Sequence, residues 1–129
     1  MATFSFELVS PERVLFSGDA TSVVVPGAEG DMTVLANHAP VMTALRAGIV
    51  TVDGGKRLFV RGGFADVTPA GLTLLAEQAV AVEDIDAEKV SAQLRDAQED
   101  LRDAKTDEAR ARAQEAIDGL QAMLAAVRH

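Results

Sequence analysis

The chain of 129 residues contains no cysteine, no tryptophan and no tyrosine, and its five phenylalanines are the only aromatic residues. Without cysteine the chain can form neither a disulfide nor a thiolate nucleophile nor a Cys-based zinc site. Because aromatic side chains are scarce, the core has to be built from Val, Leu, Ile and Ala. Hydrophobic residues still make up 48% of the chain, which predicts a packed fold and excludes wholesale disorder.

Long apolar runs and an excess of positive charge are also missing. No stretch approaches the ~20 apolar residues of a membrane span, and the start, "MATFSFELVSPERVLF", lacks the basic and apolar segments of a signal peptide. We therefore expect a soluble protein that does not insert into a membrane directly. The net charge is −8, and a chain this acidic is poorly suited to neutralise phosphate groups. A direct role in binding nucleic acid or anionic lipid is not expected.

What is present divides into two parts with different periodicities. Up to about residue 84, apolar and polar residues alternate, as in "FSFEL", and "SVVVP" and "GIVTV" are rich in β-branched residues. Turn-forming pairs and clusters separate these runs at 17–18, 26–31, 53–55, 62–63 and 69–71. The spacing predicts eight to ten short strands in an antiparallel sandwich or barrel over residues 1–84.

From residue 85 onward the pattern predicts helices. Glycine occurs there only at position 119, proline is absent, and good helix formers dominate. Two apolar stripes at 3-4 spacing follow, one through Val90 and Ala97 and one through Ala113, Ile117, Leu120, Leu124 and Val127. Asp86 and Thr106 stand where they can cap two helices. The fold class is thus α+β: an N-terminal antiparallel β-sandwich followed, over residues 85–129, by an antiparallel two-helix hairpin.

Candidate chemistry centres on His38, in the segment "ANHAP". A histidine can act as a general base or a metal ligand, but His38 has no cysteine, no nucleophile motif and no second internal histidine beside it. A structural or interface role for His38 is therefore favoured over catalysis. The stretch "GAEGD" lacks the Gly-Lys-Ser/Thr ending of a phosphate-binding loop and is read as an exposed turn. The residues predict no catalytic site, no metal site and no cofactor.

The order of three segments carries a family resemblance. "PGAEGD" is followed by "HAPVMTALRAG" and then by "GGFADV". This order resembles the epsilon subunits of bacterial F-type ATP synthases, whose mitochondrial counterpart is called delta, and the similarity extends over essentially the whole chain. It implies a sandwich of about ten strands and a two-helix C-terminal domain. It further implies a non-catalytic central-stalk (rotor) subunit, held peripherally on the cytoplasmic face of the bacterial inner membrane.

The resemblance also assigns partners and contact residues. It implies that His38, Ala39, Pro40 and Thr43 face the gamma subunit, and that Glu29, Gly30 and Asp31 approach the loops of the c-ring. Some family members bind ATP at the start of the first helix. The matching positions here are Ile85, Asp86 and Lys89, but Lys and Val stand where the motif has Arg and Ala, which favours Asp86 as a plain helix cap.

In part of the family the helices also rise into the alpha/beta catalytic hexamer and inhibit hydrolysis. Residues 86–129 carry seven basic and ten acidic residues, a difference of −3, which disfavours docking onto an acidic segment. We expect weak inhibition at most. Two other classes of function stay open on the residues alone: a free-standing adaptor that docks through its helical hairpin, and a small hydrolase built around His38.

Overall fold

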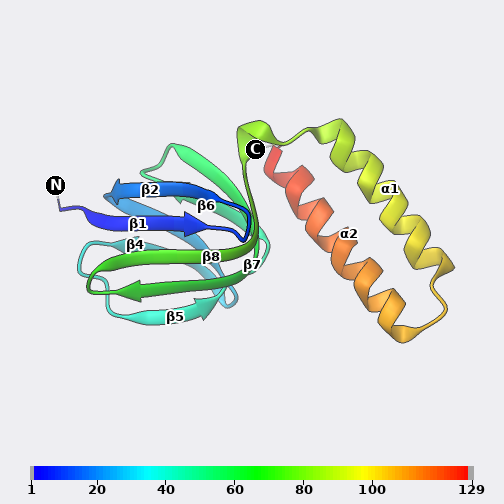
Figure 1. Cartoon of the computed structure of the whole chain (residues 1–129), viewed down its shortest axis with the longest axis horizontal. Coiled ribbons are helices and arrows are strands. Elements are labelled where there is room, and N and C mark those ends of the chain that lie inside the picture. The colour runs from blue at the N-terminus through cyan, green and yellow to red at the C-terminus, as the bar shows by residue number, and fades with distance from the viewer. Residues whose placement is uncertain (1, 128–129) are drawn as a thin grey trace. The chain divides into compact units, whose positions relative to one another are not determined.

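A computed structural model describes residues 2–127. The chain divides into two compact units, residues 1–82 and residues 83–129. Among the described residues, all strands lie in the first unit and both α-helices lie in the second (Figure 1). The predicted fold class, a β-sandwich followed by a two-helix hairpin, is confirmed. No helix within residues 2–127 has both the length and the apolar character needed to cross a membrane.

The first unit consists of eight strands: β1 (Phe4–Val9), β2 (Val14–Ala20), β3 (Ser22–Gly27), β4 (Gly30–Leu35), β5 (Val41–Ala44), β6 (Gly48–Val52), β7 (Lys56–Thr68) and β8 (Gly71–Ala81). Their hydrogen-bonded order is β2-β1-β8-β7-β6-β3-β4, and β5 pairs separately with β7. All pairs are antiparallel except β1 with β8, which is parallel. The number of strands lies at the lower end of the eight to ten expected.

Two of the expected turns lie inside strands, which is why the strands are fewer and longer. Ser17 and Gly18 belong to β2, and Gly62 and Gly63 belong to β7. The other three turns occur where predicted, between β3 and β4, between β6 and β7, and between β7 and β8. Glycine-containing turn sequences therefore reverse the chain at three sites, whereas at the other two they lie within a continuous strand.

Gly62 and Gly63 mark the place where β7 passes from one layer of the sandwich to the other. Before them Leu58 and Val60 face the core and β7 pairs with β6; after them Ala65 and Val67 face the core and β7 pairs with β5. The inward side of the strand thus changes from even to odd positions. Both glycines have positive φ, 70° and 97°, and a Cβ on Gly63 would lie 1.8 Å from the carbonyl oxygen of Leu75. Only glycine fits this crossing.

The core between the layers is mainly aliphatic, as the composition required, and also contains the fully buried ring of Phe6. Val23, Val50 and Leu74 are fully buried in it. The rings of Phe6 and Phe16 are in contact, with centroids 5.1 Å apart.

The β6–β7 turn is attached to the β2–β3 junction by Asp53. Its Oδ1 accepts hydrogen bonds from the backbone N–H and hydroxyl of Thr21, at 2.7 and 2.8 Å, and from the backbone N–H of Ser22 at 3.0 Å. These hydrogen bonds favour the charged carboxylate and lower the pKa of Asp53 below its ordinary value. The bond from the Ser22 backbone N–H contributes most to this lowering. These hydrogen bonds also hold Asp53 in a left-handed conformation, with φ of 52°.

The second unit consists of a short 3₁₀ turn (Val82–Asp84), α1 (Ala87–Asp103) and α2 (Asp107–Val127). Both predicted caps are confirmed. The Asp86 carboxylate accepts from the backbone N–H of Glu88 and Lys89, and the Thr106 hydroxyl accepts from that of Ala109. In α1 the buried residues, Val90 and Ala97, belong to the predicted stripe.

The buried side of α2 differs in part from the prediction. Ala113 and Ile117 are buried as expected, but the remaining buried residues are Gly119, Met123 and Ala126, while Leu120, Leu124 and Val127 are half-buried. An α-helix advances 3.6 residues per turn, so a strict 3-4 stripe drifts around its axis. Toward the end of α2 the buried side therefore moves to the positions just before Leu120, Leu124 and Val127. Arg128 and His129 lie outside the described residues.

Candidate docking surfaces

The segment "ANHAP" forms the connection between β4 and β5. Asn37 is left-handed, with φ of 67°, and the His38 backbone N–H donates to the Leu35 carbonyl over 3.1 Å. Nδ1 of His38 lies 2.7 Å from the carbonyl oxygen of Ala39, so the imidazole is held against its own backbone. Ala39 and Pro40 are exposed, and Pro40 restricts the backbone before it. This corner is accessible and its backbone is restricted by Pro40, which limits the order lost on docking.

His38 also lines a small pocket of about 230 Å³. The other lining residues are Phe4, Val34, Leu35, Asn37, Val67, Thr68, Pro69 and Gly71. None of these described residues is acidic and none is a second histidine. A general base needs a nucleophile to activate, and the one hydroxyl in this lining, that of Thr68, is already hydrogen-bonded to backbone groups of Ala70 and Gly71. Within residues 2–127, no three His, Cys, Asp or Glu side chains are grouped as a metal site.

Thr43 faces a different side from the rest of its predicted contact set. In β5 it pairs with Ala65, which is fully buried on the core side of β7. Cβ directions alternate along a strand, so Thr43 also points toward the core side, where it is half-buried near Gly27. Its neighbours Met42 and Ala44 point outward. Met42, which is 65% exposed, is therefore the more accessible side chain of this strand.

Outward-facing apolar residues continue from β5 across four more positions of the sheet. Directly paired residues run from Ala44 to Phe64, to Leu75, to Val9 and to Val14, across β5, β7, β8, β1 and β2. Directly opposite residues lie on one face of a sheet. We call these five residues, with Met42 beside them, the outer apolar row. Phe64, Leu75 and Val14 are 55%, 54% and 56% exposed.

The sequence analysis missed this row, although a signal for it existed. Met42, Phe64 and Leu75 are apolar residues at positions that the strand alternation assigns to solvent. Single exposed apolar residues are ordinary, and their sequence positions give no sign that they adjoin one another. The strand pairing brings them together. An apolar row this continuous on a sheet face is typical of a surface that packs against a partner.

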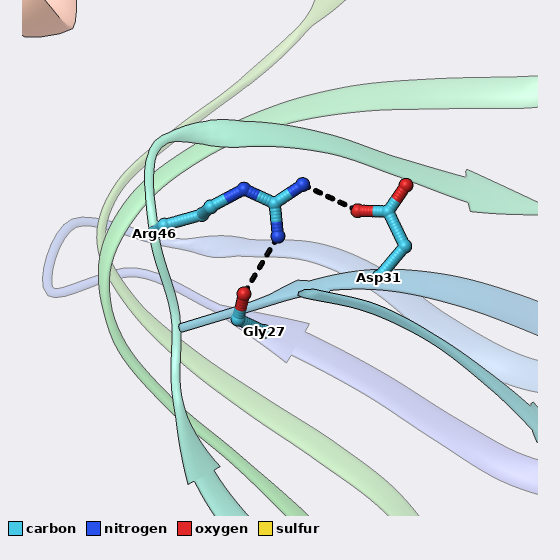
Figure 2. A network of polar contacts seen from close by, with 3 residues as sticks. All are labelled: Gly27, Asp31 and Arg46. Carbon is cyan, nitrogen blue, oxygen red and sulfur yellow. Dashed lines mark hydrogen bonds and ion pairs between the residues drawn. The ribbon is translucent and has the colours of Figure 1, made fainter. Parts of the chain in front are cut away.

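The second predicted contact, Glu29 to Asp31, lies on the hairpin that joins β3 and β4. Ala28 and Glu29 form its two-residue turn, and Glu29, Gly30 and Asp31 are all exposed. Arg46, from the connection between β5 and β6, lies across this hairpin (Figure 2). Its Nη2 is 2.5 Å from Oδ1 of Asp31, and its Nη1 donates to the Gly27 carbonyl over 2.6 Å. The sequence analysis did not foresee this contact between residues 15 positions apart.

The three positions considered for nucleotide binding, Ile85, Asp86 and Lys89, lie at or just before the start of α1. Oδ1 of Asp86 lies 3.0 and 3.2 Å from the two backbone nitrogens that it caps, so its carboxylate already has a structural role. A shallow hollow of about 460 Å³ lies nearby on α1. It is lined by Ala87, Glu88, Ser91 and Arg95, and not by Ile85, Asp86 or Lys89. The carboxylate of Glu88 in that hollow is unfavourable for a phosphate group.

Comparison with known proteins decides the family. A family model of the β-sandwich domain of the ATP synthase delta/epsilon chain matches residues 3–82. The chain belongs to the ATP synthase delta/epsilon family. It is 52% identical over 128 residues to the ATP synthase epsilon chain of Mesorhizobium japonicum, covering 96% of this chain and 95% of that one. Its identity to the epsilon chain of Maricaulis maris is 54% over 127 residues, with 96% of each covered.

Solved structures agree with this delta/epsilon assignment. A chain in the mitochondrial ATP synthase of Euglena gracilis superposes with a TM-score of 0.83 at 25% identity, over 98% of this chain and 82% of that one. A chain in the Tetrahymena thermophila enzyme superposes with a TM-score of 0.68 at 11% identity, over 98% and 97% of the two chains, and so shares the fold. The family expected from the sequence is confirmed, and the chain is a non-catalytic subunit of ATP synthase.

Proposed function

We propose that this delta/epsilon chain is a central-stalk subunit of the F-type ATP synthase, which couples rotation of the c-ring to the catalytic head through the gamma subunit. The epsilon chains that it matches over nearly their whole length support this role. The Euglena structure that it resembles is an assembly of OSCP, F1 and the c-ring. Held by such an assembly, the chain is peripheral on the cytoplasmic face of the bacterial inner membrane.

The outer apolar row is the observation that carries the proposal. A subunit that transmits torque needs a stable interface with the gamma subunit. Burial of apolar surface supplies most of the free energy of such an interface. We assign the row to the gamma interface, together with the adjoining corner of His38, Ala39 and Pro40. Thr43 contributes by holding the core side of β5, whose outward residues Met42 and Ala44 belong to the row.

The β3–β4 hairpin is the second contact in this proposal. Glu29, Gly30 and Asp31 meet the polar loops of the c-ring. The hairpin is short and exposed, and backbone groups at an exposed turn can hydrogen-bond a partner without first breaking strand pairs. A contact of this kind is polar, in contrast to the apolar contact with gamma.

The helical unit is assigned at most a weak regulatory role at the alpha/beta hexamer. The excess of acidic residues in 86–129 disfavours docking against an acidic surface. Nucleotide binding at Ile85, Asp86 and Lys89 is not part of the proposal, because Asp86 caps α1.

A charge placed in the outer apolar row tests the proposal. Membrane vesicles would be stripped of this subunit and reconstituted with the full chain or with Met42→Glu, and binding to gamma would be measured. Burying an unpaired carboxylate at a packed interface costs more than about 1.4 kcal/mol, so the affinity should fall about tenfold or more. Met42 is preferable to Thr43 for this test because a charge at Thr43 would also disturb the core side of β5.

Thr33→Glu is the matched control. Thr33 is exposed on β4, away from the outer apolar row, and the variant adds the same charge to the sandwich. It should bind gamma as the unmodified chain does. Equal binding by Met42→Glu and the unmodified chain would remove the row from the interface. Failure of the unmodified chain to bind gamma at all would overturn the proposed function.

A further inference from the structure

Arg46 is the one basic side chain that the structure places on the β3–β4 hairpin, among the residues it describes. It comes from outside the hairpin, from the segment between β5 and β6. Its guanidinium contacts the Gly27 carbonyl at the end of β3 and the Asp31 carboxylate at the start of β4 (Figure 2). One side chain therefore joins both arms of the hairpin immediately beside the turn.

Backbone hydrogen bonds fix the place from which Arg46 reaches. Its own N–H donates to the Pro26 carbonyl over 3.0 Å, and the Ala28 N–H donates to the Ala44 carbonyl over 2.8 Å. Gly27 and Leu45 also form an isolated β-bridge. The backbone of Arg46 is thus fixed, and its guanidinium donates two hydrogen bonds from that fixed position. A lysine has a single ammonium group on a flexible stem and cannot hold both acceptors in the same planar arrangement.

The contact separates the roles of the two acidic residues on the hairpin. Oδ1 of Asp31 is engaged by Arg46, and this pair largely offsets the charge of Asp31. Glu29, at the turn, has no hydrogen bond or ion pair with any other described residue and is exposed. The hairpin therefore presents the carboxylate of Glu29 to a partner, while that of Asp31 is used within the chain.

We propose that Arg46 is a positioning residue for the c-ring contact and that Glu29, rather than Asp31, carries the charge that basic or hydrogen-bond-donating groups on the ring loops recognise. This inference rests on the proposed function. Arg46 does not touch the ring in this account; it fixes the hairpin that does. Preformed order in the hairpin reduces the entropy lost when the contact forms.

The expected effects are modest because the pair is exposed. The side chains of Arg46 and Asp31 are 45% and 64% exposed, and pairs of this kind typically change an equilibrium by about two- to fivefold. Salt at about 1 M should weaken the effect, because exposed ion pairs are partly screened by salt.

The experiment measures proton pumping per ATP hydrolysed in vesicles reconstituted with the full chain. Arg46→Ala and Asp31→Asn should each lower this ratio by about two- to fivefold at low salt, and together by no more than Arg46→Ala alone, because Arg46→Ala already removes the pair with Asp31. Arg46→Lys should recover part of the loss. Glu29→Gln should lower the ratio when Arg46 is present, and should lower it less when Arg46 is already replaced, because Arg46 acts by fixing the hairpin that presents Glu29. Binding to gamma and the circular dichroism of each variant should be unchanged.

Three results would overturn the inference. One is full pumping by Arg46→Ala, and another is multiplication of the Arg46→Ala and Asp31→Asn effects. The third is full pumping by Glu29→Gln. In each case the unmodified chain still restores pumping, so the proposed function stands. If the unmodified chain does not restore pumping, the proposed function fails instead.

Discussion

Replacing Gly63 by alanine should be among the most damaging single-methyl additions to the sandwich. Gly63 has a φ of 97°, and an added Cβ would lie 1.8 Å from the Leu75 carbonyl oxygen and 2.8 Å from the carbon of that carbonyl. The oxygen belongs to the β7–β8 pair, the pair shared by both layers. It cannot retreat without opening the ladder on either side.

The magnitude has two parts. The left-handed conformation costs an alanine about 1–2 kcal/mol. Displacement of packed backbone costs about 1–3 kcal/mol more, the usual range for overpacking. A loss of about 3 kcal/mol in the free energy of unfolding corresponds to a fall of at least roughly 12 °C in the melting temperature of a unit this small.

Two other glycines provide matched controls. Gly54 has a φ of 73° but open space around its Cβ position, so Gly54→Ala should lose only the conformational part, about 1 kcal/mol. Gly55 has neither a positive φ nor a close neighbour, so Gly55→Ala should be neutral or slightly stabilising through the unfolded chain.

The assay is thermal unfolding of the full chain, followed by circular dichroism at a wavelength dominated by the strands. The expected order of melting temperatures is Gly55→Ala, then Gly54→Ala, then Gly63→Ala. Equal losses for Gly54→Ala and Gly63→Ala would show that the contact with the Leu75 carbonyl relaxes freely, and the account of the layer crossing would then be wrong.

Three further predictions concern pH, separability and regulation. The lowered pKa of Asp53 means that its stabilising effect is present above the ordinary aspartate pKa of 3.8 and is lost as the pH falls below it. The melting temperature of Asp53→Asn should therefore lie below that of the unmodified chain at pH 7 and approach it near pH 3. A difference in melting temperature that stays the same across this range would contradict the role given to Asp53. Residues 1–84 should fold and bind gamma alone, whereas residues 86–129 alone should be only marginally helical by circular dichroism, because Ala supplies much of their apolar seam; a stably helical monomeric fragment would refute the second part. Removing residues 86–129 from the assembled enzyme should change ATP hydrolysis by less than severalfold, and a larger gain would show strong inhibition by the helices.

Local chemistry was sufficient to predict much of this protein. The caps at Asp86 and Thr106 involve backbone groups two or three residues away, so the residues themselves decide where the helices begin. The turn at residues 53–55 is likewise a matter of adjacent residues. The order of the "PGAEGD", "HAPVMTALRAG" and "GGFADV" segments was enough to identify the family.

The tertiary structure decided what depends on strand pairing. Nothing local distinguishes Gly62 and Gly63, which lie inside a strand, from the glycines of a turn; the difference comes from β5, β6 and β8, which pair on either side of them. The same holds for the faces of neighbouring residues, since the pairing of Thr43 with Ala65 turns Thr43 to the core side and Met42 outward. Registers of five strands assemble the outer apolar row, and the connection after β5 brings Arg46 to Asp31. The sequence alone does not show that such residues are neighbours. Strand register brings them together, and register is fixed by burial of the core between the two layers.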